Sequence, residues 1–71
     1  MIFTVTDDIR DASWQVVLPQ GAEVCATVLK DLFRCFGIDR VQLDGVWFRL
    51  RNDEELGFSM NAETAEQAAT Y

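Results

Sequence analysis

The sequence of 71 residues contains no histidine, one proline and only six basic residues, against twelve acidic ones. The absence of histidine excludes Ser-His and Cys-His nucleophile pairs and histidine-dependent metal sites. The net charge of −6 argues against a nucleic-acid binder that acts through a basic surface. We therefore expect a protein that is not an enzyme and that holds no cofactor and no metal ion.

Long hydrophobic runs are also missing. No segment approaches the ~20 apolar residues that span a bilayer, and the N-terminus lacks the basic and apolar regions of a signal peptide. The expectation is a cytoplasmic protein without membrane contact. The two cysteines, Cys25 and Cys35, fall in one predicted helix, roughly 15 Å apart. That separation is too large for a disulfide, so both thiols are expected to be free.

Apolar residues make up 49% of the chain, which predicts a folded single domain over residues 1–71. Residues 1–6 and 13–19 each alternate apolar and polar side chains, the period of a half-buried strand. We interpret them as a hairpin joined by the polar turn DDIRDA. Trp14 is expected in the core, because it shares a strand face with two apolar residues.

Residues 22–36 change to the period of a helix, with a broad apolar face opposite a polar stripe. Gly37 is well placed to end this helix in the left-handed conformation. Residues 56–60 predict a further strand, and residues 62–70 a short C-terminal helix. The class is therefore α+β, in the order ββαββ(β), with one main helix packed on a mostly antiparallel sheet.

Between the helix and the last strand, Asp44-Gly45 favours a two-residue type I′ hairpin, which pairs Leu43 with Val46. Counting outward assigns each residue of 40–51 to one face of the sheet. The core face holds Val41, Leu43, Val46, Phe48 and Leu50. The opposite face gathers Arg40, Gln42, Trp47, Arg49 and Arg51.

The segments IFTVT, WQVVLP, the helix ending FGI, and RVQLDGVWFRL follow one another in the order of a ubiquitin-like domain. Over residues 2–50 the chain resembles the β-grasp fold in its order of elements. This resemblance implies that the sheet face turned away from the helix, which carries Trp47, binds partners. The chain ends in AATY without a terminal Gly-Gly, so conjugation chemistry is not implied. A simple antiparallel meander over 40–60 with the helix across it is the competing arrangement.

Two interpretations of Trp47 stay open. In one, the C-terminal segment covers the indole with Ala62, Ala65 and Ala69, and the arginines stack on the indole or pair with Glu63 and Glu66. In the other, an exposed tryptophan among arginines forms the hot spot of a protein interface.

Acidic side chains gather in two loops. The first loop holds Asp7, Asp8 and Asp11, and the second holds Asp53, Glu54 and Glu55. They are either solvated turns or contacts for a partner with a basic, nucleic-acid-binding surface.

These features predict a small acidic module that binds a larger protein and modulates or inhibits it by docking. The chain is similar in size and charge to phage and mobile-element inhibitors, anti-CRISPR proteins included, some of which mimic nucleic acid with carboxylates. Its partner binding would then weaken steeply with salt.

Three alternatives remain. The first is a ubiquitin-like adaptor or assembly subunit that binds through the exposed sheet face with little salt dependence. The second is single-strand nucleic-acid binding on Trp47 with Arg40, Arg49 and Arg51, which the overall charge opposes. The third concerns assembly, since an open sheet could form a homodimer by pairing its edges.

Overall fold

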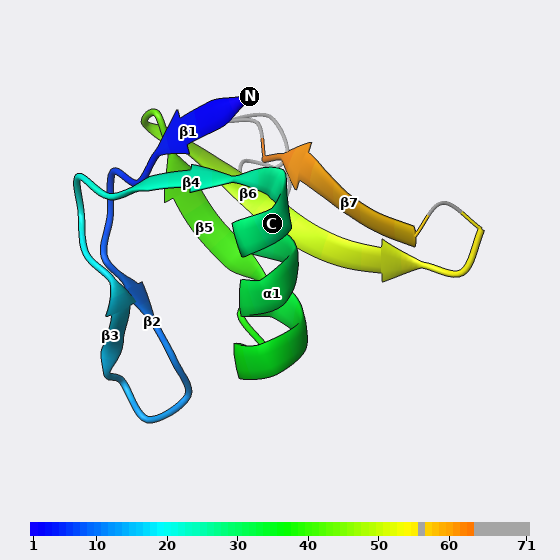
Figure 1. The fold of residues 1–71 in the computed structure, drawn as a ribbon, viewed down its shortest axis with the longest axis horizontal. Helices are drawn as coiled ribbons and strands as arrows, with labels where there is room; N and C mark the ends of the chain where they lie inside the picture. The colour runs from blue at the N-terminus through cyan, green and yellow to red at the C-terminus, as the bar shows by residue number, and fades with distance from the viewer. Residues whose placement is uncertain (56, 64–71) are drawn as a thin grey trace.

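A computed structural model of the chain describes residues 1–55 and 57–63 (Figure 1). Its elements are, in order, β1 (Ile2–Thr4), β2 (Ile9–Arg10), β3 (Val16–Leu18), β4 (Glu23–Cys25), α1 (Ala26–Phe36), β5 (Arg40–Leu43), β6 (Val46–Asp53) and β7 (Gly57–Ala62). Every strand pair in the described residues is antiparallel. The predicted α+β class with one main helix is therefore confirmed. The order of elements is compatible with a β-grasp-like arrangement.

Strands β5, β6 and β7 form a three-stranded antiparallel meander. The predicted register is confirmed, because Leu43 pairs with Val46 and Gln42 with Trp47. Asp44 and Gly45 both have positive φ, 52° and 80°, as a type I′ turn requires. β7 extends to Ala62, where the sequence had predicted a helix. The remainder of that predicted helix, 64–70, lies outside the described residues.

The predicted N-terminal hairpin is wrong. β1 pairs with β4, placing Phe3 opposite Val24, and β2 pairs with β3, placing Ile9 opposite Leu18. The physical reason is Ile9, which is only 3% exposed although it lies in the segment predicted as a polar turn. Burying this side chain draws the acidic segment back against the core as strand β2, so the hairpin pairs this segment with Val16–Leu18.

The helix begins at Ala26, four residues later than predicted. Residues 23–25 are extended because they complete the sheet beside β1, with Val24 buried between exposed and half-buried neighbours. The end of the helix is confirmed. Gly37 adopts φ 68°, and its N–H donates to the Phe33 carbonyl while that of Ile38 reaches Leu32.

Helix α1 covers one face of the β5–β6 sheet (Figure 1). The core consists of nine buried apolar side chains: Val5, Ile9, Val24, Leu29, Leu32, Ile38, Val41, Leu43 and Leu50. Val46 was predicted to join them but is 42% exposed, because it follows the turn at the end of the sheet. An isolated bridge from Val5 to Leu43 joins β1 to β5. No helix of the described residues is long and apolar enough to cross a membrane.

Candidate functional site

The sheet face away from α1 carries the predicted set of polar and aromatic residues. Val41 and Leu50 turn into the core, and strand alternation places Arg40, Gln42, Trp47 and Arg49 on the opposite side. Arg51 continues this row on β6, exposed and opposite Ser59. The structure therefore brings together four of the five residues predicted as a binding face, with the fifth farther along the strand.

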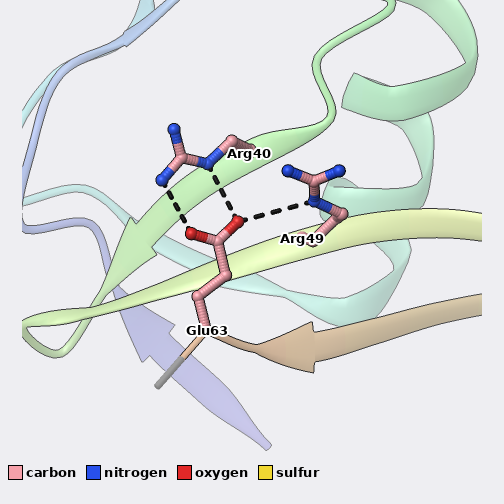
Figure 2. Close-up of polar contacts among 3 residues, drawn as sticks. All are labelled: Arg40, Arg49 and Glu63. Atoms are coloured by element: carbon pink, nitrogen blue, oxygen red, sulfur yellow. Dashed lines mark hydrogen bonds and ion pairs between the residues drawn. The ribbon is translucent and has the colours of Figure 1, made fainter. Parts of the chain in front are cut away.

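Glu63, directly after β7, holds two of these arginines (Figure 2). Arg40 donates from Nε and Nη2 to the two carboxylate oxygens, at 3.0 and 2.7 Å, and Arg49 Nε lies 3.5 Å from Oε1. The Arg40 hydrogen bonds hold the pKa of Glu63 below its ordinary value, with a smaller contribution from Arg49. The predicted pairing of the arginines with Glu63 is confirmed, whereas Glu66 lies outside the described residues.

Trp47 is half-buried and held on two sides. The Arg40 guanidinium lies over its ring, 5.0 Å from the centroid. With the Gln42 amide oriented to satisfy its neighbours, its oxygen accepts from Trp47 Nε1 at 3.2 Å and its nitrogen donates to Thr6. The indole is thus fixed in position while part of its surface stays accessible, which is the geometry of a preorganised contact residue.

Trp14 is 74% exposed, so the prediction that it belongs to the core is wrong. Its backbone is left-handed, with φ 67°, in a loop where the Asp11 carboxylate accepts hydrogen bonds from the Ser13 and Gln15 N–H groups. The Arg10 guanidinium lies over the indole at 5.3 Å and donates to the Trp14 carbonyl at 2.8 Å. Trp14 and Arg10 therefore form a second stacked Arg–Trp pair.

The two Arg–Trp pairs face one open hollow of about 320 Å³ between the β2–β3 hairpin and β5–β6. We call it the Arg–Trp hollow; its lining residues are Asp7, Asp8, Ile9, Arg10, Trp14, Arg40, Val41, Gln42 and Trp47. The strand pattern of the sequence did not indicate it, because about half of its lining comes from the hairpin whose pairing was mispredicted. Both tryptophans of the chain line this site.

The two acidic loops do not form one surface. Figure 1 places the β2–β3 hairpin and the β6–β7 turn on opposite sides of the molecule. Asp8 accepts from the Gln20 N–H at 2.7 Å and lies 3.8 Å from Arg10, while Asp53 accepts from the Glu55 N–H. Asp7 lines the hollow, and no hydrogen bond or ion pair to it occurs within residues 1–55 and 57–63. Asp7 and Asp8 of the first loop thus line the hollow, whereas Asp11 and the described residues of the second loop do not.

Other chemistry in the described residues is sparse. No cluster of three thiolates or carboxylates there could hold a metal ion. Cys25 and Cys35 are free. Cys25 is the N-cap of α1, where the backbone N–H groups of Val28 and Thr27 lower the pKa of its thiol. This thiol lies at the junction of β4 and α1, away from the residues that line the hollow.

Comparisons of the chain with protein families, curated proteins and solved structures found no match.

The Glu63 ion pair predicts a specific dependence on pH. Because the folded-state pKa is depressed, ionised Glu63 stabilises the fold above its ordinary pKa of 4.5, and this stabilisation is lost as pH falls through the lowered value. Urea unfolding of wild type and Glu63→Gln should therefore differ most at neutral pH and converge as the pH falls below the lowered pKa of Glu63. Glu54→Gln, in the β6–β7 turn, removes the same charge without contacting Arg40. A constant difference between wild type and Glu63→Gln across this range would contradict the pairing.

Proposed function

We propose that this protein is a small non-catalytic binding module that docks on a larger protein through the Arg–Trp hollow and thereby modulates or inhibits it. The observation that carries the proposal is the placement of both tryptophans, each stacked by an arginine, around one open hollow. A domain of 71 residues has a small core and gains stability by burying a tryptophan side chain, yet Trp14 remains 74% exposed. Partner binding would supply the missing burial.

The energetics of interfaces support this choice of residues. Tryptophan and arginine are the side chains most enriched at interface hot spots, where they lie in pockets that become desolvated on binding. Here both arginines are already ordered, Arg40 by Glu63 and Arg10 by the Trp14 carbonyl. The entropy lost on binding is therefore reduced before the partner arrives.

A nucleic-acid mimic is one form that this inhibitor could take. The net charge of −6 and the position of Asp7 and Asp8 at the hollow favour a partner with a basic surface. Likeness to phage or anti-CRISPR inhibitors rests on size and charge alone. On this proposal, partner binding weakens steeply as salt is raised.

A ubiquitin-like adaptor is the second candidate. It is favoured by an order of elements compatible with a β-grasp and by the position of Trp47 on the sheet face away from α1. An adaptor of this kind would bind mainly through apolar burial, so its affinity would change little with salt. The salt dependence of the isolated complex separates the two candidates.

The test is quantitative affinity capture with immobilised wild type and two matched variants. Trp14→Ala removes an exposed side chain of the hollow, and the control Glu54→Gln/Glu55→Gln alters the acidic turn on the opposite side. A true partner should lose at least about tenfold in affinity for Trp14→Ala and keep its affinity for the control. An equal loss of partner affinity in both variants would mean that the partner binds through the overall negative charge of the protein, and it would overturn docking at the hollow.

A further inference from the structure

Strand β5 pairs with β6 on one side only, and its residues 40–42 line the hollow. Leu50 donates its backbone N–H to the Asp39 carbonyl at 2.7 Å, which makes the opposed residues Arg40 and Arg49 a pair without mutual hydrogen bonds. The backbone N–H and C=O of Arg40 consequently point away from β6. Alternation turns the backbone of Gln42 the same way, and its carbonyl accepts from the Thr6 N–H at 3.1 Å.

The chain that pairs with this edge leaves it after Thr6. Two hydrogen bonds flank the Val5–Leu43 bridge: the Thr6 N–H donates to the Gln42 carbonyl, and the Asp44 N–H donates to the Thr4 carbonyl at 2.9 Å. Farther along, within the described part of the chain, no hydrogen bond reaches the backbone N–H or C=O of Arg40. These two main-chain groups therefore stand open where β5 lines the hollow, whereas the backbone of Gln42 already lies opposite Thr6.

We propose that this edge of β5 binds an extended segment of the protein partner, which adds to the sheet as a short strand and directs a basic side chain at Asp7 and Asp8. The inference rests on the proposed function and specifies the form of the partner. An open strand edge supplies main-chain hydrogen bonds to an added strand, and the pockets beside it select alternate side chains. Here Trp14 and Trp47 line the same hollow as residues 40–42 of β5.

Charge complementarity selects a basic segment. Arg40 is neutralised by the two-oxygen contact with Glu63, and Arg10 lies 3.8 Å from Asp8. Asp7 lines the same hollow without an ion pair in the described residues. Of the four charged side chains that line the hollow, Asp7 is therefore the one that a basic group of a partner can pair with, in a protein whose net charge is −6.

Amide hydrogen exchange of the free, full chain tests the open edge directly. The Arg40 amide should exchange at least about tenfold faster than that of Val41, whose register partner is Phe48 on β6. Slow exchange of Arg40 in dilute protein would mean that the chain itself already occupies the edge. Protection that appears only at high protein concentration would assign the edge to a second copy. Either result overturns the inference, while docking on the tryptophans would still stand.

Two capped hexapeptides test the occupant: one alternates lysine and valine, the other glutamate and valine. Titrated into labelled protein, the basic peptide should shift and protect the Arg40 amide, and the acidic peptide should not. Asp7→Asn/Asp8→Asn should weaken binding of the basic peptide about tenfold, whereas Glu54→Gln/Glu55→Gln should leave it within about twofold. Equal binding of both peptides, or no change at the Arg40 amide with either, would overturn the inference. Loss of a captured partner with Trp14→Ala would still support the proposed function.

Discussion

Replacing Leu43 by alanine is expected to lower the free energy of unfolding by about 3 kcal/mol. Leu43 is fully buried, and it lies where β1, β5 and β6 meet, since it bridges Val5 on one side and pairs with Val46 on the other. Its truncation leaves a cavity that this junction cannot close without breaking one of these pairings. A domain of 71 residues has only about 5–15 kcal/mol of stability in total, so the loss is a large part of it.

Urea unfolding followed by circular dichroism measures this loss, and the chain offers a matched control. Val46 is the register partner of Leu43 and is 42% exposed. Val46→Ala should therefore cost less than about 1 kcal/mol. An equal loss in the free energy of unfolding for the two variants would contradict the difference in burial between Leu43 and Val46.

The end of the helix and the β5–β6 hairpin were predictable because residues close together in the sequence determine them. Asp44-Gly45 specifies the turn, and the alternation on either side then fixes the register and the face of each residue. The grouping of Arg40, Gln42 and Trp47 follows from that register alone. The end of the helix was likewise set by one residue, Gly37.

The first half was mispredicted because its pairing is not local. β1 pairs with β4, about twenty residues along the chain, and nothing in the short segment around Phe3 distinguishes that partner from a nearer strand. The start of α1 shifted for the same reason. Residues 23–25 fit a helical period as well as an extended one, and the sheet decides between them.

The missing half of the Arg–Trp hollow is a consequence of this error. Trp14 and Arg10 reach the hollow only because the acidic segment supplies strand β2 of the β2–β3 hairpin. One local signal could have indicated it. Asp11 followed by Ala-Ser is a sequence in which the aspartate caps the N–H two residues on, which marks a turn at Trp14 rather than a strand.

The hydrophobic pattern placed Trp14 in the core and Ile9 in a polar turn, and the burial of the two side chains is the reverse. Ile9→Ala should lower the free energy of unfolding by about 3 kcal/mol, because Ile9 is 3% exposed and anchors the hairpin in the core. Trp14→Ala should change it by about 0.5 kcal/mol or less, since most of the indole faces solvent. Urea unfolding followed by circular dichroism compares the two without relying on tryptophan fluorescence.

The same two variants separate the scaffold from the binding surface. Trp14→Ala retains the fold and is expected to lose partner affinity, so its defect appears only in the binding measurement. Ile9→Ala loses affinity in proportion to the fraction of unfolded chain, and a binding measurement at lower temperature should restore it if the protein remains folded there. A large loss of stability in Trp14→Ala would instead place this tryptophan in the core and remove it from the proposed interface.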